Sequence, residues 1–281
     1  MSANLKKSLK ELSKRGPHHV LEGDLGYTGL PGKIYTPEKG NGLPAIAFGH
    51  DWTKPIKHYH ATLRHLASWG IVVAAPDTEI GFNPDHAGFA ADLESALQIV
   101  AGVKLGNGNV SVSPKKLGVV GHGMGGGAAV LTAADNPKVG AVAAIYPANT
   151  SPSAAAAART IEAPALVIGS GKSELFDAGN PAKLAYNWKG DVAYREIENG
   201  NQQSFAEDAG FQFILGAGLP KTAARETAWG LVTGFLLHQL DNEGKYSDFS
   251  DPEATGPKVS SYAGLELADK AGFAKDDTRL F

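Results

Sequence analysis

Cysteine is absent from this chain of 281 residues. Its absence excludes disulfide bonds, a thiolate nucleophile, and zinc or iron–sulfur centres built on cysteine. The chain also has little excess charge of either sign, because 26 basic and 29 acidic side chains leave a formal net charge of −3. A balance this close to zero gives no electrostatic reason to expect a nucleic acid as partner. Hydrophobic residues make up 43% of the chain, which is enough for a sizeable globular core.

Long hydrophobic runs are missing as well, since no stretch approaches the roughly 18 apolar residues that span a membrane. The first residues, Met1–Gly16, carry lysines but have no apolar stretch behind them, so they lack the pattern of a signal peptide. We therefore expect a cytoplasmic protein without a transmembrane segment.

The two ends of the chain differ in pattern from its middle. In residues 1–16, three leucines share one stripe of a helix that is ringed by lysines: Leu5, Leu9 and Leu12. We expect an amphipathic helix docked on the chain's own domain, although a basic helix also fits an anionic membrane or a protein partner. Residues 251–281 are polar and glycine-rich, and we expect this tail to wrap the domain or to contact a partner.

Residues 17–250 alternate short apolar runs with helical patterns. Continuous apolar runs bounded by turns are typical of parallel strands buried on both faces. The runs are Leu43–Gly49, Ile71–Pro76, Leu117–His122, Val139–Pro147, Ala163–Gly169 and Val192–Glu198. The helical patterns are His58–Ser68, Ala87–Val103, Gly125–Ala134, Asn180–Trp188 and Thr222–Leu240. The alternation predicts one α/β domain, a mostly parallel central sheet covered by helices on both faces, with a hairpin in Val20–Thr36 before it.

The most informative motif is Gly121-His122-Gly123-Met124-Gly125, between a buried apolar run and a helical stretch rich in glycine and alanine. This is the frame of a nucleophile elbow, G-x-S-x-G, in which a sharp strand-to-helix turn presents a catalytic side chain. The middle residue here is Gly123, which has no side-chain oxygen, so no acyl-enzyme can form on it. Glycine also relieves the backbone strain of such a turn, which costs an ordinary residue about 1–3 kcal/mol.

Together with this motif, the segments FGHDWT, WGIVVAAPDT, APALVIG and FLLHQLDNEGKYSDF give the chain a resemblance to the α/β-hydrolase fold. Within that fold it resembles the bacterial cutinase-like polyester hydrolases and the dienelactone hydrolases, over about Leu43 to Phe249. The resemblance implies a serine at the elbow, an aspartate after the strand APALVIG and a histidine after the next strand. Those positions fall on Gly123, Ser173 and Ser204, the last on Gln203 if the register slips by one residue. The catalytic triad is therefore predicted to be lost.

The distribution of histidines and acids supports this loss. Beyond His122 the chain has a single histidine, His238, in the middle of the last long helical pattern. Residues 142–161 contain no Asp or Glu that could serve as a relocated acid. Glu174 and Asp177 lie near the usual acid position, but no histidine is there for them to orient.

Parts of the site are expected to persist, because an oxyanion hole is built from backbone N–H groups. The resemblance implies that these groups belong to Met124 and Trp52, whose indole would add an apolar wall. Asp51 stands where the family has glycine and His50 precedes it, so a charged pair is expected at the pocket mouth. With His122 these residues form the expected ligand-binding set, suited to a small acyl or carboxylate ligand.

Three functions remain open from the sequence. The first is a catalytically inactive α/β-hydrolase-like protein, a pseudoenzyme that binds a small acyl or carboxylate ligand or a protein partner. The second is an active enzyme of the ester hydrolase or lyase type that uses His50, Asp51 and His122 as acid–base groups. The third is a scaffold that uses residues 1–16 and 251–281.

No cofactor is expected. The segment GSGKS follows a strand but has Leu166 where a phosphate-binding loop needs its first glycine. The three histidines in the first helical pattern have neither metal-ligand spacing nor acidic neighbours beyond Asp51. We therefore expect no metal, and we expect solvated surface side chains at His58, His60 and His65.

Overall fold

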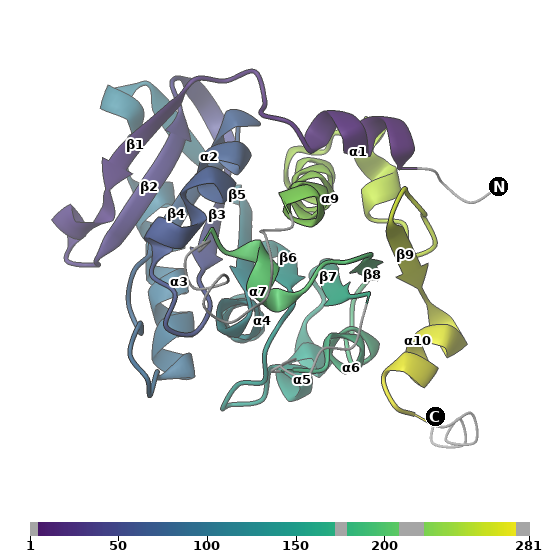
Figure 1. Cartoon of the computed structure of the whole chain (residues 1–281). Helices are drawn as coiled ribbons and strands as arrows, with labels where there is room; N and C mark the ends of the chain where they lie inside the picture. Colours follow the sequence, from purple (N-terminus) through teal and green to yellow (C-terminus); the bar gives the residue numbers. More distant parts are fainter. Residues whose placement is uncertain (1–4, 172–178, 208–221, 274–281) are drawn as a thin grey trace.

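The structure is a computed structural model that describes residues 5–171, 179–207 and 222–273 (Figure 1). Its centre is a nine-stranded sheet with the order β1-β2-β4-β3-β5-β6-β7-β8-β9. The strands are β1 Val20–Asp24, β2 Gly32–Pro37, β3 Gly40–Gly49, β4 Val72–Pro76, β5 Val110–His122, β6 Val139–Ile145, β7 Ala165–Ser170, β8 Val192–Ile197 and β9 Val259–Tyr262. Strands β3 to β8 are mutually parallel, and the pairings of β1 with β2, β2 with β4 and β8 with β9 are antiparallel.

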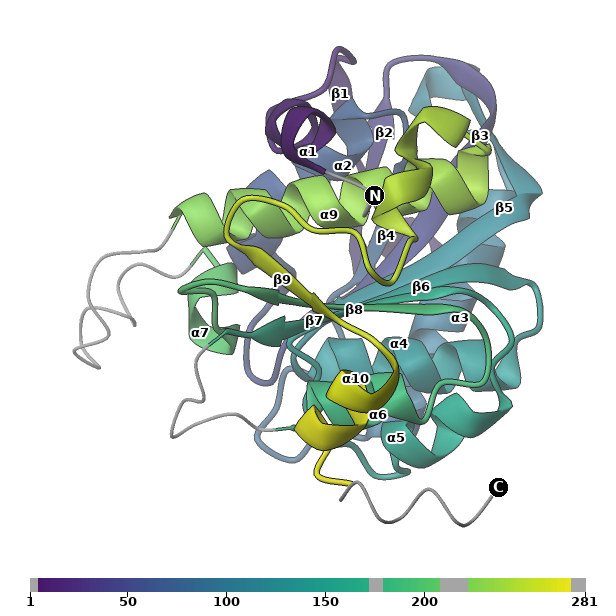
Figure 2. The same ribbon diagram turned by 90° about the vertical axis from the view of Figure 1, so that its right-hand side faces the viewer.

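Helices cover both faces of the sheet (Figures 1 and 2). The α-helices are α1 Lys6–Leu12, α2 His60–Ser68, α3 His86–Gly102, α4 Met124–Asp135, α5 Ala154–Ala157, α6 Pro181–Tyr186, α7 Gln202–Phe205, α9 Thr222–Asp241 and α10 Gly264–Lys270. Short 3₁₀ turns are η1 Leu25–Thr28, η2 Ile56–Tyr59, η3 Gly106–Gly108, η4 Ala158–Thr160 and η5 Gly244–Phe249. The predicted parallel sheet with two helical layers is confirmed, and it is the architecture of the α/β-hydrolase fold.

The continuous apolar runs of the strands serve two separate cores. Along β3, Ile46 and Phe48 pack with α1, α2 and α9, whereas Ala45 and Ala47 pack with α3 and α4 on the other face. All four side chains are fully buried. Because successive side chains of a strand point to opposite faces, a strand buried on both faces has no polar positions.

The N-terminal helix α1 packs on α9 (Figure 2). Its leucine stripe is buried, namely Leu5, Leu9 and Leu12. The lysines of α1 lie on its outer face. Among the described residues, no helix is long and apolar enough to cross a membrane.

The C-terminal tail joins the sheet through β9, which the sequence did not predict. Arg195 on β8 is fully buried, and its guanidinium donates hydrogen bonds to four backbone carbonyls and one hydroxyl of residues 248–261. The acceptors are the carbonyls of Asp248, Phe249, Asp251 and Ala254 and the hydroxyl of Ser261. A buried charge is tolerated only when it is hydrogen-bonded, and here residues 248–261 supply the partners.

His65 corrects one sequence prediction. Its side chain is buried, not solvated: the ring stacks on Trp229 and its Nε2 lies 3.2 Å from the hydroxyl of Thr233 on α9. Burial lowers the pKa of His65 to about 4. The prediction was wrong because α9 presents a polar group to the inner face of α2, which a pattern of apolar residues does not reveal.

Candidate functional site

The elbow has the predicted geometry. Strand β5 ends at His122 and helix α4 begins at Met124, so Gly123 forms the turn, with φ 54° and ψ −119°. A side chain is disfavoured at this positive φ. A Cβ on Gly125 would overlap the backbone of Gly49, so glycine lets the start of α4 pack directly against the end of β3. The site therefore lies at the carboxyl edge of the parallel strands, where ligands bind in open α/β sheets.

Asp51, in the loop after β3, fills the space over the elbow. A Cβ added to Gly123 would overlap the Asp51 carboxylate. Oδ1 of Asp51 accepts hydrogen bonds from the backbone N–H groups of Met124 at 2.9 Å and Trp52 at 2.8 Å. Its Oδ2 accepts from Nε2 of Gln202 at 2.9 Å. The side chain of Asp51 thus covers Gly123 from above.

The two N–H groups on Oδ1 are those that the resemblance assigns to an oxyanion hole. Such a hole holds a negatively charged oxygen at about 2.7–3.1 Å from two donors, and Oδ1 of Asp51 lies within that range of both. Met124 is also the first residue of α4, where the helix dipole favours negative charge. An anion from the chain itself therefore occupies the position that a reacting carbonyl oxygen would take.

Gln202 reaches Asp51 because its loop is held on both sides. Asn201 and Ser204 form a capping box at the start of α7, in which the Asn201 side chain accepts from the backbone of Ser204 and the Ser204 hydroxyl accepts from the backbone of Asn201. Past the helix, the Glu207 carboxylate accepts from the N–H groups of Ala61 and Thr62 at the start of α2, both at 3.0 Å. These contacts hold the segment that follows β8 against the start of α2.

The three predicted triad positions therefore have different outcomes in the structure. Gly123 forms the elbow, Ser204 is a helix-capping residue, and Ser173 lies outside the described residues. Gln202, two residues before Ser204, is the side chain that faces the elbow from the loop after β8, and the sequence prediction missed it. The spacing of Asn201 and Ser204, which is that of a helix cap, was the signal that could have placed Gln202 on the first turn.

His122 is buried below the elbow and contacts Asp51 only through an intermediate. Its Nδ1 lies 2.9 Å from the hydroxyl of Tyr59, which accepts from the backbone N–H of Asp51 at 3.0 Å. Tyr59 therefore donates its proton to Nδ1, and the proton of the ring sits on Nε2, which has no hydrogen-bond partner among the described residues. Burial lowers the pKa of His122, an effect that the negative charge of Asp51 offsets in part, and burial raises the pKa of Tyr59.

His50 does not lie at the pocket mouth, in contrast to the expectation. It is fully buried, with Nδ1 at 2.9 Å from the carbonyl of Asp51 and Nε2 at 2.7 Å from the carbonyl of Thr78. The ring packs on Phe89. His50 thus contacts two main-chain carbonyls and His122 contacts the hydroxyl of Tyr59, and neither imidazole bonds to the carboxylate of Asp51. The exclusion of His50 from the mouth follows from its apolar neighbour and its two carbonyl partners.

Trp52 lies on the outer side of Asp51, where its side chain is 48% exposed. Its indole N–H donates to the carbonyl of Phe82 at 3.2 Å, and the two rings meet edge to face. The side chain of Phe82 is 87% exposed. An exposed aromatic pair therefore stands beside the covered elbow. No group of three His, Asp or Glu side chains that could hold a metal occurs in the described part of the chain.

Comparison with known proteins supplies the family context. The model of the Dienelactone hydrolase family matches residues 30–240. Cutinase est1 of Thermobifida alba is 29% identical over 195 residues, which cover 66% of this chain and 64% of that protein. Cutinase est2 of the same organism is 28% identical over 264 residues, which cover 90% of this chain and 79% of that protein. The chain thus matches less than two thirds of the length of Cutinase est1.

Proposed function

The chain belongs to the dienelactone hydrolase family, and we propose that it is a catalytically inactive member that acts by binding and not by hydrolysis. One observation carries the proposal: above a glycine elbow, the carboxylate of Asp51 accepts hydrogen bonds from both N–H groups of the oxyanion hole. The fold of a hydrolase is then retained as a scaffold for recognition.

Two separate blocks to hydrolysis support inactivity. Loss of the nucleophile of a working triad costs about 10⁶-fold in rate, because the triad acts as a unit. Such variants keep a residual rate of about 10³–10⁴ over water, which comes from the oxyanion hole and from substrate binding. Here Asp51 fills the hole, so that residual route is blocked as well. A substrate carbonyl would first have to displace the Asp51 carboxylate, which the chain holds beside the two N–H donors of the hole.

The second candidate is an enzyme that uses Asp51 with His50 and His122. It is favoured by one feature, the placement of the Asp51 carboxylate on the elbow, where a reacting group of this fold is expected. Against it, neither imidazole bonds to that carboxylate, and both rings are buried. An acid–base pair needs hydrogen-bond reach between the two groups, so these contacts favour the inactive protein.

An ester assay tests the proposal. We expect the purified protein to hydrolyse p-nitrophenyl acetate and butyrate no faster than a boiled control. Activity that follows the protein through purification would overturn the proposal. If that activity disappears in both His50→Ala and Asp51→Ala, the second candidate is the correct one.

A matched pair of variants tests the role given to Asp51. Asp51→Gly empties the oxyanion hole, so we expect ester hydrolysis to rise above background by up to about 10²-fold, the size of one to two hydrogen-bond donors in such a hole. Asp51→Asn keeps an oxygen in the same place, and we expect no rise. Equal rates for the two variants would contradict the view that Asp51 closes the hole.

A further inference from the structure

Two exposed aromatic side chains stand beside the covered elbow, and their rings form an open corner. The ring planes of Trp52 and Phe82 meet at 73°, with the ring centroids 6.0 Å apart. Both side chains are exposed, so both rings present their surface to solvent. The face of an aromatic ring carries partial negative charge and attracts a cation that lies within about 6 Å of the ring centroid. The corner therefore offers two ring faces to one small cation.

The corner belongs to two loops that are joined to each other, the loop after β3 and the loop after β4. The indole N–H of Trp52 donates to the carbonyl of Phe82 at 3.2 Å. Nε2 of His50 lies 2.7 Å from the carbonyl of Thr78. Thr53, next to Trp52, has a φ of 54°, a strained conformation for a β-branched residue and one that is concentrated at ligand sites. Because the two loops already contact each other, a ligand would bind without ordering them first.

Carboxylates gather on or beside the same two loops. Each accepts hydrogen bonds from neutral donors, and none takes part in an ion pair within residues 5–171, 179–207 and 222–273. They are Asp51 after β3, Asp77, Glu79 and Asp85 after β4, and Asp92 on α3. The lysines between β3 and α2 are Lys54 and Lys57, so the carboxylates are in excess even when His50 is counted as a cation between its two carbonyl partners. This excess favours a cation at the corner and opposes an anion.

The hydrogen bonds of these carboxylates also decide which kind of cation fits. A primary ammonium has three N–H groups that need acceptors, but the carboxylates already accept from the chain itself: Oε2 of Glu79 from the N–H of Asp85, for example, and Oδ1 of Asp85 from the N–H of Ala87. In the described part of the chain, no group of three His, Asp or Glu side chains could hold a metal ion. A quaternary ammonium has no N–H group to satisfy, and aromatic faces are the surfaces that recognise it.

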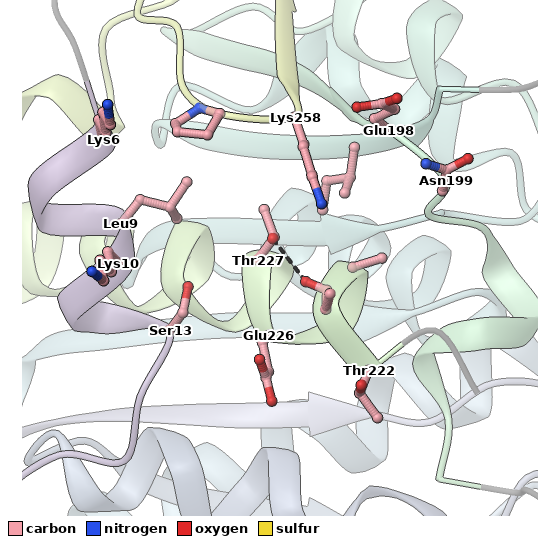
Figure 3. Close-up of a pocket in the computed structure, with 14 residues that line it drawn as sticks. Lys6, Leu9, Lys10, Ser13, Glu198, Asn199, Thr222, Glu226, Thr227 and Lys258 are labelled. Carbon is pink, nitrogen blue, oxygen red and sulfur yellow. Dashed lines mark hydrogen bonds between the residues drawn. The ribbon is translucent and has the colours of Figure 1, made fainter. Parts of the chain in front are cut away.

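The groove between α1, the first turns of α9 and the end of β8 has no such preference (Figure 3). Its volume is about 580 Å³, and none of the described residues that line it is aromatic. The carboxylates of Glu198 and Glu226 line it. So do the ammonium groups of Lys10 and Lys258, while Lys6 has an interaction of its own. Charges of the two signs are thus balanced there, and the groove serves as the control location for the corner.

We propose that the corner between Trp52 and Phe82 binds a small quaternary ammonium ligand, with the cation against both ring faces and the surrounding carboxylates as its counter-charge. The inference rests on the proposed function, because it names the ligand class of a protein that binds and does not hydrolyse. It also agrees with the covered elbow, where Asp51 already supplies an anion to the oxyanion-hole donors and leaves no place for the carboxylate of a ligand.

An NMR titration of the full chain with choline tests the site. The readout is the signal of the indole N–H of Trp52, which is assigned by its absence in Trp52→Leu. We expect a shift that saturates at millimolar choline. The uncharged carbon isostere of choline, 3,3-dimethylbutan-1-ol, has the same shape without the cation, so it should bind at least about fivefold more weakly.

Variants of the corner and of its surroundings locate the ligand. Phe82→Leu removes one ring face, so choline binding should weaken about fivefold, whereas Phe82→Tyr keeps the face and should bind like the parent. Tyr27→Leu is the matched control, because Tyr27 is an exposed aromatic residue of η1 outside the corner. Asp85→Asn keeps the cap of α3 but removes a negative charge, so it should weaken binding by a few fold at low salt and less at high salt. Glu226→Gln, in the groove, should have no effect.

Four results would overturn the corner as the site: no saturable shift, equal affinity for the uncharged isostere, equal affinity in Phe82→Leu, or an affinity that responds to Glu226→Gln and not to Phe82→Leu. The last result would place the ligand in the groove. The ester assay is a separate readout, so the two proposals can fail independently. Ester turnover together with choline binding that depends on Phe82 overturns inactivity alone, whereas inactivity without choline binding overturns the corner alone.

Discussion

Asp51 over the elbow and Arg195 under the tail are both buried charged side chains, and their hydrogen-bond partners differ in origin. Two of the donors to Asp51 are backbone N–H groups set by the turn from β5 to α4 and by the loop after β3. The acceptors of Arg195 all belong to residues 248–261, a segment that is held on the sheet through this same guanidinium.

The two contacts differ in whether the main-chain partners would keep their positions without the charged side chain. The elbow is formed by close glycine packing and would present its N–H groups without Asp51, so water or another anion could take its place. The carbonyls of residues 248–254 converge on one point because a cation stands there. Removing Asp51 should therefore change the chemistry of the site more than the stability, whereas removing Arg195 should change the stability.

The largest effect is expected from Arg195→Met. The variant leaves several buried carbonyls without donors, and loss of one partner of a buried charged network typically costs about 3–5 kcal/mol. Urea denaturation should show this loss in the free energy of unfolding, together with early hydrogen exchange in β9. Arg159→Met is the control, because Arg159 is exposed and makes one side-chain contact, to Asn187; we expect a change within about 0.5 kcal/mol. Equal losses in the two variants would mean that the buried Arg195 contributes no more to stability than an exposed arginine, which would contradict the contrast drawn with Asp51.

A double-mutant cycle between Gly123 and Asp51 should give the next largest effect, a coupling energy of about 2 kcal/mol. In the natural chain, Gly123→Ala places a Cβ in the Asp51 carboxylate as well as at a positive φ. In an Asp51→Gly background only the backbone strain remains, so the same substitution should cost less. The free energies of unfolding of the four proteins measure the coupling. If the two single effects add within about 0.5 kcal/mol, the carboxylate does not occupy the position of the missing side chain.

A smaller loss, about 1 kcal/mol, is expected from Gln202→Leu. The variant leaves Oδ2 of Asp51 without its side-chain donor but keeps both backbone donors on Oδ1. Gln98→Leu is a matched control at an exposed position of α3, and its free energy of unfolding should stay close to that of the parent. A loss as large as that of Arg195→Met would show that Gln202, not the backbone, is the main partner of Asp51.

Much of the fold could be predicted because burial on both faces leaves a clear pattern. The apolar runs of β3, β4 and β6 have no polar interruption, and each was placed within a few residues of its observed bounds. The first half of β5 was missed because Val110–Lys116 alternates polar and apolar residues and contains a proline. Strand β9 was missed for another reason: its pairing with β8 depends on contacts with Arg195, far away in sequence.

The site could be predicted in its backbone but not in its side chains. The missing nucleophile at Gly123 is visible in the sequence, and the positions of the two N–H donors follow from the frame of the elbow. Whether Asp51 points into the hole or out to solvent depends on one side-chain rotamer and on the donors around it. The sequence prediction named Ser204, but Gln202 is the side chain that faces the elbow. This offset of two residues depends on where the helix α7 begins, which is set by the Asn201 cap.

The smallest effect is expected in the pH dependence of the unfolding free energy that arises from His122. It is also the most specific test of the contrast between the elbow and the site of Arg195. Burial lowers the pKa of His122 in the folded protein below the ordinary value of about 6.5, so the unfolded chain binds a proton more readily than the folded chain does. The stability that neutral His122 contributes is complete above about pH 6.5 and is lost as the pH falls toward the lowered pKa. Protonation would also occur at Nδ1, the atom that accepts from Tyr59.

We expect the difference in unfolding free energy between the parent and His122→Gln to shrink from about pH 7.5 to about pH 5. The penalty of Arg195→Met should stay constant over the same range, because the pKa of Arg195, lowered by burial to about 10, leaves it charged throughout. A difference for His122→Gln that grows on acidification would mean that the ring beside the elbow is charged in the folded protein.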